Sequence, residues 1–229
     1  MLAESFRTTL ASILFSTENG NSPRLIVVTS CSPMAGKTTV TTNLGIALAE
    51  INRRVLLIDG DLRKPRLHHV FHLQNPRGLT DILLEKDPVE EYSLESLVQR
   101  TEIPGLHVLG SGTATHNISN LLFSTRLPEL LERFKREFDT ILIDTPPMLS
   151  LSDARVLGRL SDGVILVFFA RSTSRDAALT AVELFREDHT PVLGTILNHW
   201  NPKRNPTHDP YDGYYYQNAD KPKGTGKSA

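Results

Sequence analysis

Residues 24–39, RLIVVTSCSPMAGKTT, decide the fold. The run Leu25–Val28 is apolar and rich in β-branched residues, which is typical of a buried strand. A short polar loop follows, and Gly36, Lys37 and Thr38 then begin an apolar-periodic helix. A strand, a tight loop and a helix start form a phosphate cradle, because backbone N–H groups and the helix dipole point at anionic oxygens. In such a cradle Lys37 adds a positive charge, and the Thr38 hydroxyl can ligate Mg²⁺.

The loop departs from the usual phosphate-binding pattern at one position. Cys31 stands five residues before Gly36, where a glycine is usual. A Gly-Lys-Thr triplet also occurs by chance, so an ordinary strand–turn–helix remains the alternative on this stretch alone. If the loop binds a nucleotide, we expect the contacts to come from Ala35, Gly36, Lys37, Thr38 and Thr39.

The composition excludes several classes of protein. Of 229 residues, 39% are hydrophobic and 22% are charged, as in ordinary globular chains. A net charge of −1 gives no global attraction to nucleic acid, so we expect no nucleic-acid partner. The single cysteine excludes an internal disulfide and fits a reducing cytoplasm. The longest apolar run, Val164–Ala170, is too short to cross a bilayer, so at a membrane another segment or partner would have to hold this protein.

Strand and helix patterns alternate along the chain. Helical periodicity is clearest over residues 37–51, 125–138 and 175–187. This alternation predicts an α/β fold: a doubly wound, mostly parallel sheet of about six to eight strands with helices on both faces, as in P-loop NTPases. The predicted core strands begin near Leu25, Val55, Leu106, Ile141, Val164 and Val192.

Carboxylates follow two of these strands. Asp59 and Asp61 come after VLLI, and Asp144 comes after TILI. Ligands of open α/β sheets bind at the carboxyl ends of strands, so we expect these aspartates beside the loop. There Thr38, Asp59 and Asp144 would hold Mg²⁺, and a carboxylate would accept a proton. A solvated acidic turn at Asp59 and Asp61 is the alternative.

The histidines of RLHHVFHL offer a second, weaker metal hypothesis. Helical spacing would put His68 and His72 on one face. No cysteine or carboxylate completes a site there, so we favour a packed or solvated helix.

The sequence divides into three predicted regions. Residues 1–20 contain an amphipathic helix over residues 2–16 that is a possible oligomerisation element. Residues 21–200 form the P-loop domain. Residues 201–229 lack periodicity and should be a disordered tail. That tail carries four of the five tyrosines: Tyr211, Tyr214, Tyr215 and Tyr216. Chance, or a segment that docks on a partner through its aromatic side chains, would explain this cluster.

Together these motifs resemble the bacterial tyrosine kinases of capsule and exopolysaccharide export, which are related to partitioning and septum-site ATPases. The segment LLIDGDLRKP is similar to that family's second aspartate motif, Walker A′, and is the most specific match. The other matching segments are TSCSPMAGKTT for Walker A, ILIDTPP for Walker B, GTILN for the strand whose Asn198 approaches the nucleotide base, and YDGYYYQ for the terminal tyrosine cluster.

The resemblance implies an ATP- and Mg²⁺-dependent protein-tyrosine kinase that regulates polysaccharide export. Lys37, Asp59, Asp61 and Asp144 would be catalytic, with Asp61 as the acceptor of the tyrosine proton. The tail tyrosines would be phosphorylated between subunits of a homo-oligomer. A transmembrane activator, or a fused membrane domain, would hold the kinase at the cytoplasmic face of the cell membrane.

Two departures from the family pattern stand out. Met34 and Ala35 replace a Gly-Glu pair in the loop, and Leu10 replaces an arginine of an assembly motif. The alternatives are therefore a partitioning-type ATPase switch and a catalytically weak nucleotide-binding scaffold. The early loop residue Ser32, where partitioning ATPases carry lysine, and the tyrosine cluster favour the kinase.

Overall fold

The computed structural model describes residues 2–14, 22–115 and 117–200. The chain divides after Asn198 into two units, and the helices and strands of the described residues lie in the first. The predicted tail, residues 201–229, lies outside the described residues.

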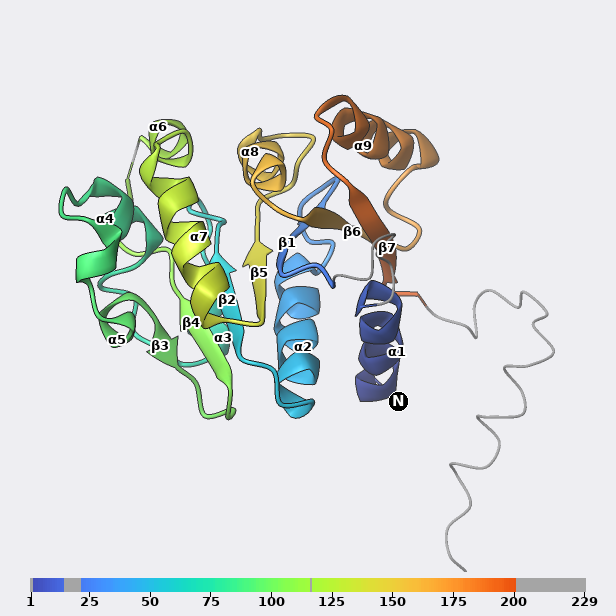
Figure 1. The fold of residues 1–229 in the computed structure, drawn as a ribbon. Coiled ribbons are helices and arrows are strands. Elements are labelled where there is room, and N and C mark those ends of the chain that lie inside the picture. Colours follow the sequence, from blue (N-terminus) through green and yellow to red (C-terminus); the bar gives the residue numbers. More distant parts are fainter. Residues whose placement is uncertain (1, 15–21, 116, 201–229) are drawn as a thin grey trace, which may run out of the picture. The chain divides into compact units, whose positions relative to one another are not determined.

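A seven-stranded sheet forms the centre of the first unit (Figure 1). Its order is β3-β4-β2-β5-β1-β6-β7, and every pairing is parallel except that of β3 with β4. The predicted doubly wound architecture is therefore confirmed. The strands are β1 (Leu25–Ser30), β2 (Val55–Asp59), β3 (Gln99–Arg100), β4 (Leu106–Leu109), β5 (Thr140–Asp144), β6 (Gly163–Phe169) and β7 (Val192–Asn198). Only β3 was not predicted, because two polar residues carry no periodicity.

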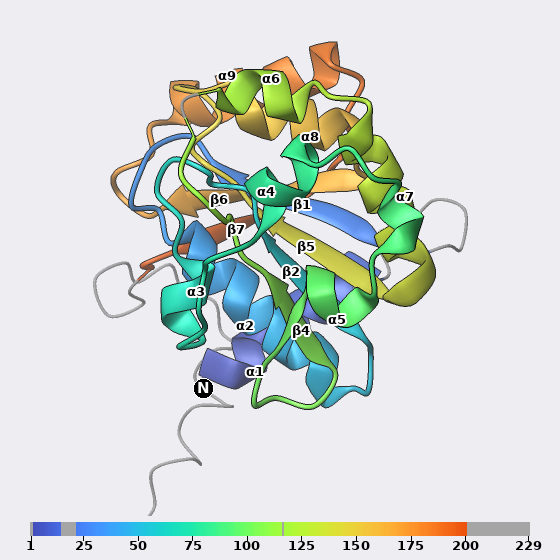
Figure 2. The same ribbon diagram turned by 90° about the vertical axis from the view of Figure 1, so that its left-hand side faces the viewer.

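Helices cover both faces of the sheet (Figure 2). One face carries α1 (Leu2–Leu14), α2 (Lys37–Glu50) and α3 (Leu67–Val70). The other face carries α4 (Leu79–Leu84), the 3₁₀ turn η1 (Val89–Glu91), α5 (Leu94–Leu97), α6 (Ile118–Leu122), α7 (Arg126–Glu137), α8 (Asp153–Arg159) and α9 (Arg175–Glu187).

The apolar runs of the central strands form two cores because successive side chains point to opposite faces. In β1, Leu25 and Val27 belong to the core under α7 and α8, whereas Ile26 and Val28 belong to the core under α2. All six residues of β1 are buried. A strand covered on both faces buries side chains on both, which explains the uninterrupted apolar run LIVV; the buried polar residues Thr29 and Ser30 follow at its carboxyl end.

The predicted N-terminal helix is present as α1 and packs on α2 of the same chain. Leu10 and Ile13 are buried in the core beneath α2. Arg7 donates to Glu50 over 3.0 Å, but both side chains are about half exposed, so this ion pair stabilises little.

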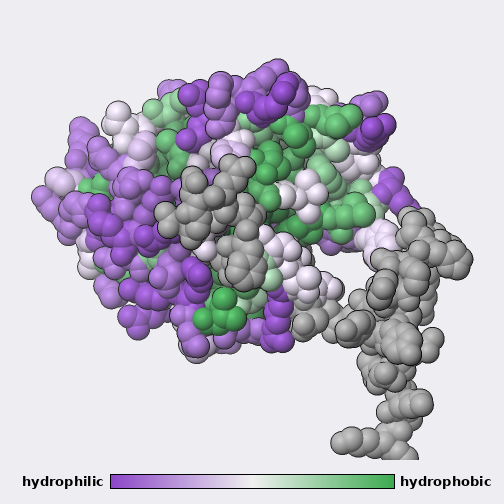
Figure 3. Space-filling view, turned by 45° about the vertical axis from the view of Figure 1, so that its right-hand side comes forward, coloured by the Kyte–Doolittle hydropathy of each residue, from purple (hydrophilic) through white to green (hydrophobic). Residues whose placement is uncertain are grey.

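The sheet is less protected at its β7 edge. The side chains of β7 are half-buried or exposed, in contrast to the fully buried β1, β2 and β5. Leu179 of α9 and Leu197 of β7 are each 56% exposed, and apolar residues gather on this side (Figure 3). Among the described helices, none combines the length and apolar character needed to cross a membrane.

Candidate active site

The loop between β1 and α2 is shaped by two left-handed residues. Gly36, which caps α2, has φ 88°, and Met34 has φ 62°. Left-handed backbone costs a non-glycine residue roughly 1–2 kcal/mol, yet Met34 adopts it with its side chain 81% exposed. Ala35 is fully buried, and its carbonyl oxygen accepts a hydrogen bond of 2.9 Å from Asn198 Nδ2. The departure at residues 34 and 35 therefore preserves a tight, supported loop.

The two residues that begin α2 lie at the sheet's carboxyl edge. Lys37 is only 8% exposed, and its burial lowers its pKa although the charges of Asp144 and Asp61 act in the opposite direction. The hydroxyl of Thr38 donates a hydrogen bond of 2.5 Å to Asp144 Oδ2. Thr39 follows on the exposed side of the helix.

Asp59 and Asp144 lie at paired positions on the adjacent strands β2 and β5. Their exposed fractions are 0% and 1%. Burial is the main cause that raises the pKa of Asp59 to about 6 and that of Asp144 to about 7; the charge of Asp61 raises both further, and the charge of Asp59 also raises that of Asp144. Asp59 Oδ2 accepts the backbone N–H groups of Arg66 and Leu67 at 2.8 and 2.9 Å.

Each of these two carboxylates keeps one buried oxygen unused. Oδ1 of Asp59 and Oδ1 of Asp144 have no hydrogen-bond partner among the described residues. Buried polar atoms without partners are costly, so they commonly mark the place of a ligand. Oxygen donors from two carboxylates and a threonine hydroxyl match the preference of Mg²⁺. The donor set thus fits the metal that the sequence suggested.

Asp61 differs from the buried pair. It is partly exposed, and its Oδ1 accepts the backbone N–H of Lys64 at 3.0 Å. Arg63 turns toward α8 and forms an ion pair of 3.2 Å with Asp153, whose side chain is 2% exposed. Sequence reasoning missed Asp153, because an aspartate in the first turn of a helix is common on account of the helix dipole alone.

Two other sequence hypotheses have different outcomes. The tyrosines of the tail lie outside the described residues. The expectation that His68 and His72 share a helix face is wrong, because α3 ends at Val70 and His72 has a left-handed φ of 54°. A single helical turn cannot carry an i, i+4 pair beyond its own end.

Comparison with known proteins identifies the family. Residues 24–187 match the family described as AAA domain. The chain is 36% identical to tyrosine-protein kinase YwqD of Bacillus subtilis over 213 residues, which cover 93% of this chain and 86% of that protein. It is 32% identical to the tyrosine-protein kinase etk of Escherichia coli K12, covering 85% of this chain but only 26% of that longer protein.

Solved structures agree with these sequence matches. The kinase domain of Escherichia coli ETK superposes with a TM-score of 0.77 at 30% identity, covering 86% of this chain and 74% of that one. The VpsO kinase domain gives a TM-score of 0.76 at 34% identity, covering 87% and 96%. Since both the sequence and the fold match over most of the chain, this protein belongs to the bacterial tyrosine kinases and is a P-loop protein-tyrosine kinase.

Proposed function

We propose that this kinase transfers the γ-phosphoryl group of ATP to the tail tyrosines of neighbouring copies, in a Mg²⁺-dependent reaction. The observation that carries the proposal is the Thr38–Asp144 hydrogen bond beside two unpartnered carboxylate oxygens, at the end of a phosphate-binding loop. A hydroxyl and two carboxylates held in this way are suited to a metal–nucleotide complex.

The buried residues of the site bind and orient ATP. The N–H groups of the loop and the Lys37 ammonium would hold the phosphates, and Asn198 would support the loop through Ala35. Thr38, Asp59 and Asp144 would hold Mg²⁺, which neutralises developing phosphate charge when it is bound. ADP is the product.

Asp61 is the carboxylate best placed to accept the tyrosine proton. It is partly exposed, whereas Asp59 and Asp144 are sealed in the core. In the reaction the tyrosine oxygen forms a bond to the γ-phosphorus, the bond from that phosphorus to the bridging oxygen of ADP breaks, and the phenolic proton passes to Asp61. A tyrosine with an ordinary pKa near 10 needs such an acceptor.

The tail supplies a physical basis for regulation. Residues 201–229 carry five Lys and Arg against three Asp, so the unmodified tail is slightly positive. Each phosphotyrosine adds roughly −1.5 to −2 charges, so a few of them reverse its sign. We propose that this loosens a homo-oligomer. We also propose that a transmembrane activator holds the kinase at the cytoplasmic face of the membrane, and that the cycle regulates capsule or exopolysaccharide export.

Mass spectrometry of the tail after incubation with Mg-ATP tests the activity. We expect phosphate on Tyr211, Tyr214, Tyr215 or Tyr216, and its loss in Lys37→Met and in EDTA. Lys86→Met, the same change on an exposed loop, is the control. ATP hydrolysis with an unmodified tail would favour a partitioning-type ATPase, and the absence of both products would favour a scaffold.

A mixing experiment tests whether the transfer occurs between subunits. Chains with Lys37→Met keep their tyrosines but lack the phosphate-binding lysine. Active chains with all four tail tyrosines changed to phenylalanine lack the acceptors. We expect the mixture to phosphorylate the Lys37→Met tail. Transfer between subunits would be refuted if the Lys37→Met tail stayed unmodified in the mixture although wild-type chains, incubated by themselves, became phosphorylated.

A further inference from the structure

A cavity of about 290 Å³ lies at the edge of the sheet opposite to the active site. It opens beside α5, β3 and β4, which lie together in Figure 1. Arg54 precedes β2, and Asp59 ends it, so roughly 16 Å of extended strand separates the cavity from the catalytic aspartates. The cavity is lined by Arg54, Leu94, Glu95, Val98, Gln99, Arg100 and His107.

The charged side chains that line the cavity are two arginines, Arg54 and Arg100, and one carboxylate, Glu95, so the lining carries a net positive charge. Burial lowers the pKa of His107, and the positive charges of Arg54 and Arg100 lower it further. Both arginines form long, exposed ion pairs: Arg54 lies 3.9 Å from Glu137, and Arg100 lies 3.8 Å from Glu95. Strong charge-assisted hydrogen bonds are about 2.7–2.9 Å long, so a closer anion would displace these carboxylates.

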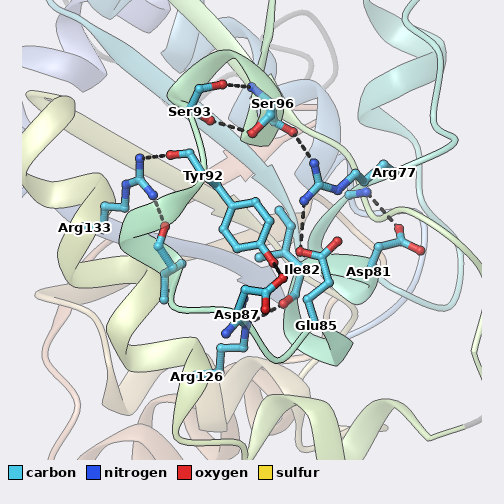
Figure 4. A network of polar contacts seen from close by, with 12 residues as sticks. Arg77, Asp81, Ile82, Glu85, Asp87, Tyr92, Ser93, Ser96, Arg126 and Arg133 are labelled. Atoms are coloured by element: carbon cyan, nitrogen blue, oxygen red, sulfur yellow. Dashed lines mark hydrogen bonds and ion pairs between the residues drawn. The ribbon is translucent and has the colours of Figure 1, made fainter.

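The opposite wall of the cavity is apolar and firmly held. Val98 is 5% exposed, and Leu94 precedes it on α5. The chain entering α5 is fixed to α7, because the Arg133 guanidinium donates to the carbonyl oxygens of Val89 and Tyr92 (Figure 4). On the sheet side, the His107 ring packs edge-on to Phe138 with centroids 5.2 Å apart. The wall is therefore preformed.

The size and the walls together restrict the ligand. Small-molecule sites usually span roughly 300–1,000 Å³, so this cavity suits a single side chain rather than a nucleotide. Inorganic phosphate would leave the apolar wall uncovered. An aryl phosphate satisfies both walls, since guanidinium groups bind phosphate bidentately and also stack on aromatic rings.

We propose that this cavity binds a phosphotyrosine side chain, with Arg54 and Arg100 on the phosphate and Leu94 and Val98 against the ring. The proposal rests on the proposed function for the source of the ligand, namely the phosphorylated tail. In the bound state the phosphate replaces Glu95 as the partner of Arg100. The kinase would then retain its own product at a site separate from catalysis.

Binding of a synthetic peptide tests this inference without any kinase activity. A fluorescent peptide of residues 208–219 with phosphotyrosine at position 214 is titrated with the phosphatase-treated full chain, and anisotropy is recorded. We expect saturable binding, with an affinity at least about tenfold higher than that of the unphosphorylated peptide. The double variant Arg54→Gln/Arg100→Gln should lose at least about tenfold in affinity.

Matched controls separate the site from general charge. The double variant Arg175→Gln/Arg186→Gln removes two exposed positive charges from α9 and should bind like wild type. Equal binding of both peptides, or unchanged binding by the Arg54/Arg100 variant, would overturn the proposal. Equal affinity for a phosphoserine peptide, or complete competition by equimolar inorganic phosphate, would overturn the assignment to phosphotyrosine. A scrambled phosphotyrosine peptide that binds as tightly would support the site and show that the tail sequence is not its only source.

Discussion

Replacement of Asp144 by asparagine should stabilise this protein in the absence of metal and nucleotide. Asp144 is 1% exposed, and one of its oxygens lacks a hydrogen-bond partner among the described residues. Asparagine keeps the shape and can still accept the Thr38 hydroxyl bond through its own carbonyl oxygen. The variant therefore removes a buried charge while it preserves the contact.

The magnitude follows from the pKa of Asp144. Burial raises this pKa from 3.8 to about 7. Between these two pH values the folded chain holds a proton that the unfolded chain has lost, so wild-type stability falls as pH rises through this window and levels off above it. Each pKa unit corresponds to about 1.36 kcal/mol, so the full penalty is about 4 kcal/mol. Roughly 2–3 kcal/mol of it develops between pH 5 and pH 8.

Urea denaturation in EDTA from pH 5 to pH 8 measures this effect. The advantage of Asp144→Asn over wild type should grow with pH and become constant above pH 7. Asp87→Asn, the same change on an exposed loop, is the control and should show no comparable growth. Addition of Mg-ADP should then stabilise wild type more than the variant, since only wild type keeps the carboxylate that we propose binds the metal. An advantage that is absent at pH 8, or equal at every pH, would refute the reasoning.

Two further predictions concern stability elsewhere in the fold. Gly78→Ala would place a Cβ atom 2.3 Å from the Gly110 carbonyl oxygen, so we expect urea denaturation to show a loss of about 2 kcal/mol or more in the free energy of unfolding. Gly194→Ala is the control, because its Cβ atom would have nothing within 4 Å, and it should change the free energy of unfolding little. Equal effects of the two substitutions would contradict the steric argument. Arg155 donates to both Asp188 oxygens, at 2.5 and 2.7 Å, and holds the pKa of Asp188 below its usual value. Because the folded-state pKa is lowered, Asp188→Asn should lower the free energy of unfolding by about 1 kcal/mol at pH 7 and by progressively less as pH falls below 3.8. If the same loss persisted at pH 2, the charge of Asp188 could not be its cause.

The local patterns of the sequence predicted most of the fold. The runs at Leu25–Val28 and residues 140–143 are predicted as strands because strands buried on both faces read as near-continuous apolar runs. The antiparallel strand β3 was missed because its two residues pair with β4 through backbone groups alone. The histidine hypothesis failed because the extent of α3 depends on its tertiary surroundings and not on the spacing of residues 68 and 72.

The sequence by itself determined which residues we propose for the chemistry, since Lys37, Thr38 and the aspartates are recognisable from their places after strands and before a helix. Only the tertiary structure decided how they meet. The Thr38–Asp144 bond joins residues 106 positions apart, and the Asn198–Ala35 bond spans 163 positions. The order of the strands in the sheet decides which carboxyl ends become neighbours, and that order depends on how the whole sheet packs. The cavity around Arg54 and Arg100 has the same origin, because no local pattern brings three separate segments to one edge of the sheet.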